Sequence, residues 1–101
     1  MKEGRDYFLP IKSEKQAKRS IQKRVSDISP GEIDILKRGA ILNMFFNVPR
    51  PDPELFDIMK KAIKKAFRDI HNLEVDAAWM YIIPEHRLIF IIKARPNRNT
   101  K

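Results

Sequence analysis

The sequence of 101 residues contains no cysteine and only three glycines. Without cysteine there is no disulfide framework, no thiolate zinc site and no cysteine nucleophile, and this absence is typical of a reducing compartment. No apolar run reaches about 18 residues, and the first residues do not read as a basic and then apolar leader, so neither a membrane span nor a secretory signal is predicted. We therefore expect a cytoplasmic protein with no membrane partner.

The composition nevertheless indicates a folded chain. Hydrophobic residues make up 43% of the sequence, which excludes intrinsic disorder for the chain as a whole. The length is that of one domain built around one core. We expect a single domain at 1–101, divided into a basic N-terminal helical region at 12–38, a β-α-β-β body at 40–95 and a basic tail at 96–101.

Positive charge is in excess and is unevenly distributed. Lys and Arg number 21 against 13 for Asp and Glu, which gives a formal net charge of +8. Residues 12–24 hold six basic side chains and one acidic one, and residues 93–101 hold four basic side chains and no acidic one. The stretch between them, 25–92, holds nine basic and ten acidic side chains and is almost neutral. Both flanks therefore carry the charge that favours a polyanionic partner.

The N-terminal region predicts two helices. Ser13 and Gln16 have capping-box spacing, and Ala17, Ile21 and Val25 recur every four residues, which predicts a helix over about 13–26. Because this apolar stripe is one residue wide, we expect the helix to lie on the surface or against a partner.

The limits of the second helix and of the first strand are predicted from residues that begin or end such elements. Ser29 as cap, Pro30 in the first turn and Gly39 as a stop predict a helix over 30–38. The segment 40–48 follows this glycine and ends before two prolines, which favours a strand.

The remaining chain predicts one long helix and a hairpin. Residues 53–72 are apolar on one half of a helical wheel, and the outward half is basic. Residues 78–83 and 87–95 read as two strands joined by a turn, and both strands are apolar on both faces. The expected fold is α+β in the order α-α-β-α-β-β. It has a small three-stranded sheet with the long helix on one face and the N-terminal helices, a dimer mate or a ligand on the other.

The leading functional hypothesis is a small non-enzymatic protein that binds DNA or RNA mainly through backbone phosphates. Basic segments at both flanks suit such contacts, each of which releases counterions. We expect a homodimer and no cofactor, metal site or catalytic residue. The candidate phosphate contacts are Lys15, Lys18, Arg19, Lys23 and Arg24 in the first helix, Lys60, Lys64 and Arg68 in the long helix, and Lys93, Arg95 and Arg98 near the C-terminus.

Two alternatives remain open at this point. One is an adaptor or inhibitor that binds an acidic protein surface through the N-terminal helix and the second apolar sheet face. The other is a Mg²⁺-dependent nuclease that uses two acidic pairs, Asp52 with Glu54 and Glu74 with Asp76. A helix of about twenty residues separates these pairs by about 30 Å, which argues against one metal site within a subunit.

Aromatic side chains on the hairpin raise a further question. Trp79, Tyr81 and Phe90 could stack on bases as aromatic residues do on some RNA-binding sheets. The strands lack the basic-Gly-aromatic run of the RNA-recognition motif, so we expect these rings to pack in the core.

Overall fold

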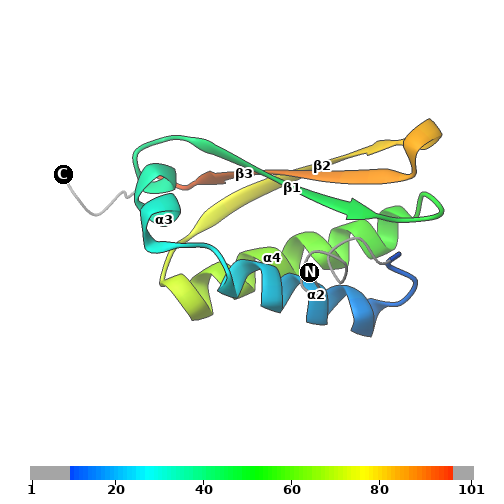
Figure 1. The fold of residues 1–101 in the computed structure, drawn as a ribbon, viewed down its shortest axis with the longest axis horizontal. Coiled ribbons are helices and arrows are strands. Elements are labelled where there is room, and N and C mark those ends of the chain that lie inside the picture. The colour runs from blue at the N-terminus through cyan, green and yellow to red at the C-terminus, as the bar shows by residue number, and fades with distance from the viewer. Residues whose placement is uncertain (1–9, 97–101) are drawn as a thin grey trace.

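The computed structural model describes residues 10–96, and these form an α+β fold in the expected order α-α-β-α-β-β (Figure 1). The elements in chain order are α2 at Glu14–Ser26, α3 at Pro30–Lys37, β1 at Ile41–Asn47, α4 at Pro53–His71, β2 at Val75–Ile82, the short 3₁₀ helix η1 at Ile83–Glu85, and β3 at Arg87–Ala94. The predicted α+β class and element order are confirmed.

Side-chain caps explain where the helices begin. Ser13 accepts a hydrogen bond from the backbone N–H of Gln16, and Asp52 caps α4 in the same way. Ser29 and Glu32 form a reciprocal capping box at the start of α3. These side chains satisfy backbone N–H groups that have no partner within the helix. After α3, Gly39 has a φ of 108°, a conformation that glycine adopts without strain.

The three strands form one antiparallel sheet in the order β1-β3-β2, so β3 is central. β2 begins at Val75, three residues before the predicted start at 78. The polar Asp76 interrupts the apolar pattern there, but it lies between the buried Val75 and Ala77, and pairing with β3 continues through all three.

One face of the sheet packs on the helices and forms the core. Phe56 of α4 is fully buried, and its ring centroid lies 5.0 Å from that of Trp79 and 5.4 Å from that of Tyr81. Phe90 is also fully buried, on β3. The aromatic rings of the hairpin therefore belong to the packed side of the sheet, as expected.

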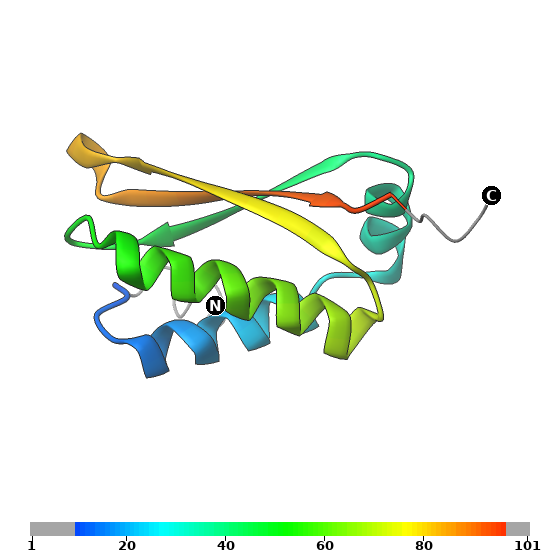
Figure 2. The same cartoon turned by 180° about the vertical axis from the view of Figure 1, so that it is seen from behind.

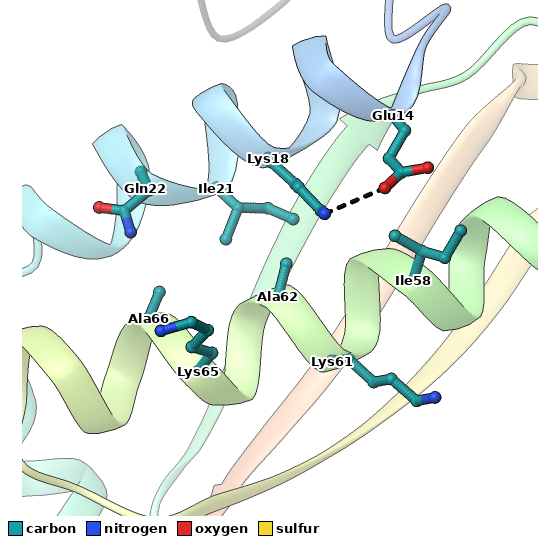
Figure 3. A pocket seen from close by; sticks show the side chains of 9 residues that line it. All are labelled: Glu14, Lys18, Ile21, Gln22, Ile58, Lys61, Ala62, Lys65 and Ala66. Atoms are coloured by element: carbon teal, nitrogen blue, oxygen red, sulfur yellow. Dashed lines mark ion pairs between the residues drawn. The ribbon is translucent and has the colours of Figure 1, made fainter.

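Helix α2 packs against α4 through its narrow apolar stripe. Ala17, Ile21 and Val25 are fully buried, and the small residues Ala62 and Ala66 of α4 lie opposite Ile21 (Figure 3). Small side chains let two helices approach closely, so a stripe one residue wide is enough to bury this face. The partner that the stripe predicted is thus the long helix of the same chain.

The second face of the sheet is open within residues 10–96. Both views show α2 and α4 on the same side of the sheet, so α2 is not the cover expected for the other side (Figures 1 and 2). Phe45 and Met80 are 44% and 47% exposed. By strand alternation the open face carries Ile41, Asn43, Phe45 and Asn47 of β1, Asp76, Ala78, Met80 and Ile82 of β2, and Arg87, Ile89, Ile91 and Lys93 of β3.

Candidate nucleic-acid interface

A groove of about 440 Å³ runs between α2 and α4 on the surface of the helical layer (Figure 3). Its apolar lining includes Ile21 and Ala62, and lysines stand along it on both helices. Lys18 comes from α2, and Lys61 and Lys65 come from α4. The fold therefore brings together basic side chains that are more than 40 residues apart in the sequence.

The basic stripe of α2 continues from the groove onto its outer surface. Lys15 lies three residues before Lys18 and four before Arg19, so the three side chains are neighbours on one helix face. Lys61 and Lys65 have the same relation on α4. We call Lys15, Lys18, Arg19, Lys61 and Lys65 the helix-layer patch.

The members of the patch are free or weakly paired. Lys15, Arg19 and Lys61 form no ion pair with any residue in the part of the chain that the structure describes. Exposed pairs between residues four apart contribute about 0.3–0.5 kcal/mol, so a phosphate can replace their carboxylates at little cost. Such pairs on the two helices are Lys18 with Glu14 at 3.0 Å, Lys23 with Asp27 at 3.9 Å and Lys65 with Asp69 at 2.7 Å.

The guanidinium of Arg24, a predicted phosphate contact, is directed toward the sheet and is bonded there. It is half-buried between α2 and β1, where its Nη1 donates a hydrogen bond to the backbone carbonyl of Phe45. Its guanidinium carbon lies 4.5 Å from the ring centroid of Phe46. Arg24 follows Ile21 by three residues and Ala17 by seven, so the helical period already placed it beside the buried stripe. It connects α2 to the sheet.

None of the predicted residues of α4 lines the groove. Lys60 and Lys64 are half-buried and close enough to Asp76 of β2 to affect its pKa, so they lie on the flank away from the groove. Arg68 is exposed. The groove is lined instead by Lys61 and Lys65, which belong to the basic outward half of the helix predicted from the sequence but were not chosen as candidate phosphate contacts. Which lysines of α4 line the groove depends on where α2 packs.

The described part of the C-terminal basic segment, Lys93 and Arg95, lies outside the helix-layer patch. Lys93 lies on the open face of the sheet, on the other side from the helices. Arg95 binds two carboxylates, with Nη2 at 2.9 Å from Oδ1 of Asp76 and Nη1 at 3.4 Å from Oε1 of Glu74. Arg98 lies outside the described residues. Within the described residues, Lys93 and Arg95 therefore lie on different surfaces from the helix-layer patch.

The contact with Arg95 lowers the pKa of the Asp76 carboxyl group. The hydrogen bond from Arg95 is the main cause that holds the pKa of Asp76 below its usual 3.8, and Lys64 and Lys60 add smaller attractions. A lowered pKa in the folded state stabilises the fold above pH 3.8, and this contribution disappears as the pH falls through the lowered value. Because the pair is exposed, the effect on stability is small.

We expect Arg95→Gln to raise the pKa of Asp76 toward its usual value, because the variant removes the cationic hydrogen-bond donor. An NMR titration of the side-chain carboxyl carbon of Asp76 measures this directly. Arg50→Gln, which removes an exposed charge from another loop, is the control and should leave the titration unchanged. A pKa of Asp76 that is equal in wild type and in Arg95→Gln contradicts the assignment of Arg95.

The acidic pairs considered for a nuclease have other contacts. Asp52 caps the N-terminus of α4, and Asp76 lies on β2, where it binds Arg95. Within residues 10–96 no group of three or more His, Asp or Glu side chains is arranged to hold a metal ion. None of the helices in this range is long and apolar enough to cross a membrane.

Comparisons of the chain with family models, with curated proteins and with solved structures give no match.

Proposed function

We propose that the protein is a small non-enzymatic nucleic-acid-binding protein that contacts the phosphates of DNA or RNA with the helix-layer patch. The observation that supports this most directly is the groove between α2 and α4, where lysines from both helices stand along one channel. Nothing in the sequence alone required the two basic helices to pack side by side. A surface of this kind binds phosphates through charge and releases counterions.

The binding is expected to tolerate different sequences. Base recognition needs side chains that read base edges, and the groove offers mainly lysines and aliphatic residues. We therefore expect affinity to depend strongly on salt and weakly on base sequence. We also propose that the protein acts in the cytoplasm and forms a homodimer.

The open face of the sheet favours a second candidate function, that of a protein-interaction module. The sequence suggested that one acidic partner would contact the N-terminal helix and the second sheet face together. These two surfaces lie on opposite sides of the molecule, so one flat partner surface cannot reach both (Figures 1 and 2). A partner on the open face would be held mainly by apolar contacts.

The test of the proposed function is a salt titration of binding to duplex DNA, single-stranded DNA and RNA. For the variant with Lys15, Arg19, Lys61 and Lys65 all replaced by alanine, we expect at least tenfold weaker binding near physiological salt. The slope of log affinity against log salt should fall by about 0.9 for each lost duplex phosphate contact.

A control variant with the same net charge distinguishes binding by the helix-layer patch from general attraction by the positive charge of the protein. The control variant replaces Lys37, Arg38, Arg50 and Lys93 by alanine, so it loses the same number of exposed basic residues outside the patch. It should keep most of the affinity and the wild-type slope. Equal losses in both variants would show diffuse attraction and no defined interface, and an unchanged slope in the patch variant would exclude the patch.

A further inference from the structure

The two edges of the sheet are protected to different extents. At β1, the outer backbone carbonyl of Phe45 accepts a hydrogen bond from Arg24. The carbonyl of Asn47 accepts one from the backbone N–H of Ile11 at 2.8 Å. Side-chain and loop contacts of this kind prevent another strand from pairing with an edge. The edge at β1 is therefore occupied at two successive outward positions.

The edge at β2 has no such protection within residues 10–96. The bond from the backbone N–H of Arg95 to the carbonyl of Glu74, at 2.9 Å, shows that even-numbered residues of β2 face β3. The backbone groups of Val75, Ala77, Trp79 and Tyr81 therefore face outward, and none of them bonds to a described residue. This edge is eight residues long and contains neither proline nor lysine, the residues that commonly block edge pairing.

The side chains of β2 increase in size along the strand, in an order that suits antiparallel pairing with the β2 strand of a second copy. The first half of the strand, 75–78, carries small side chains, and the second half, 79–82, carries large ones. When two antiparallel copies pair with Ala78 opposite Ala78, Ala77 lies opposite Trp79 and Val75 lies opposite Tyr81. Each large ring then meets a small side chain, which allows close packing on the helical side.

We propose that β2 is an interface with a second copy of this chain, formed by antiparallel pairing of the two β2 strands about Ala78. This register places outward-facing residues opposite one another and forms about eight backbone hydrogen bonds. Two three-stranded sheets join into one continuous sheet. Among possible occupants of the edge, a second copy is favoured because its own β2 supplies the matching order of sizes.

The contacts on β2 hold the interface rings in place before pairing. Trp79 donates a hydrogen bond to Asp57 at 3.1 Å, and Tyr81 donates one to the backbone carbonyl of Val48 at 2.5 Å. Both rings are only half-buried in the single chain, so a second copy can cover them. Ordered side chains lose little entropy on binding. Because each copy carries a net charge of +8, added salt should strengthen this association, whereas it weakens phosphate binding.

A single introduced cysteine tests the register. The chain has no cysteine, so Ala78→Cys gives one thiol per copy, at an exposed position. In the proposed pairing the two residues form a non-hydrogen-bonded pair with Cα atoms about 4.5 Å apart, which is within the range of a disulfide. Mild oxidation should produce a covalent dimer of Ala78→Cys. Asn43→Cys, which is exposed on the same face but on β1, should remain a monomer on denaturing gels.

Equilibrium sedimentation without nucleic acid provides the second measurement. We expect Ala78→Lys to raise the dimer dissociation constant at least tenfold, because it places two ammonium groups side by side, and Asn43→Lys to leave it unchanged. Trp79, the only tryptophan, reports the wild-type association through its fluorescence. Circular dichroism checks that both variants fold.

Several outcomes would overturn the proposal. A wild-type chain that stays monomeric at high concentration excludes a self-interface, and capture of an extended peptide by that monomer would assign the edge to another protein. A dimer that is cross-linked equally by Asn43→Cys and Ala78→Cys would indicate packing of the open faces. These results leave the phosphate-binding proposal untouched, since no step depends on the helix-layer patch.

Discussion

Replacing Phe56 by alanine is expected to lower the free energy of unfolding by about 3–5 kcal/mol. The side chain is fully buried on α4, and its ring contacts both Trp79 and Tyr81 of β2. Its loss removes apolar contact area and leaves a cavity between the helix and the sheet. Domains of this size have total stabilities of about 5–15 kcal/mol, so the variant should be close to unfolding.

Thermal and urea unfolding, followed by circular dichroism and by Trp79 fluorescence, measure this loss. A decrease of 3 kcal/mol corresponds to a melting temperature lower by roughly 12 °C or more for a chain of about 100 residues. Ile41→Ala is the control, because Ile41 is 60% exposed on the open face, and it should change stability by less than about 0.5 kcal/mol. A Phe56→Ala variant as stable as this control would mean that α4 does not pack on β2 as described.

The second large effect is expected at Arg24, where Arg24→Ala should destabilise the fold by about 2–3 kcal/mol. A hydrogen bond from a charged donor contributes about 1.5–3 kcal/mol, and the contact with the ring of Phe46 adds about 0.5–1 kcal/mol. Both contacts are lost together, and the carbonyl of Phe45 loses this bond. Arg24→Lys should recover part of the loss, because lysine can donate the bond but cannot stack its head group in the same way.

Arg19 offers a matched comparison on the same helix. Arg19→Ala removes the same charge from an exposed position of the helix-layer patch. We expect it to reduce nucleic-acid affinity and the salt slope while leaving urea unfolding unchanged, whereas Arg24→Ala should do the reverse. If the two variants behave alike in both measurements, the division between a structural and a binding arginine is wrong.

The elements that local signals define were predictable from the sequence. The apolar half of α4 and the caps at Ser13 and Ser29 depend on residues a few positions apart, and all of them are present in the structure. The start of β2 was missed because its first residues alternate with Asp76, and a short alternating pattern is weak until the partner strand is known.

The arrangement of the candidate site was only partly predictable. The stripe on α2 shows that the helix packs, but not which surface it packs against. Only the approach of α2 to Ala62 and Ala66 makes Lys61 and Lys65 groove residues and turns Lys60 and Lys64 to the other flank. Arg24, in contrast, could have been recognised as half-buried from its spacing to Ile21.

If the β2 strands of two copies pair as proposed, the unequal edges of the sheet also limit how far the assembly can grow. Pairing between two β2 strands is isologous, so it uses the free edge of both copies and leaves none for a third. At the other edge of each sheet, the contacts of Arg24 with the carbonyl of Phe45 and of Ile11 with the carbonyl of Asn47 oppose the pairing of a further strand. If both edges accepted strands, each added copy would present a new edge and the sheet could extend into a fibre. The two contacts that protect β1 therefore favour closure at two copies over open-ended polymerisation.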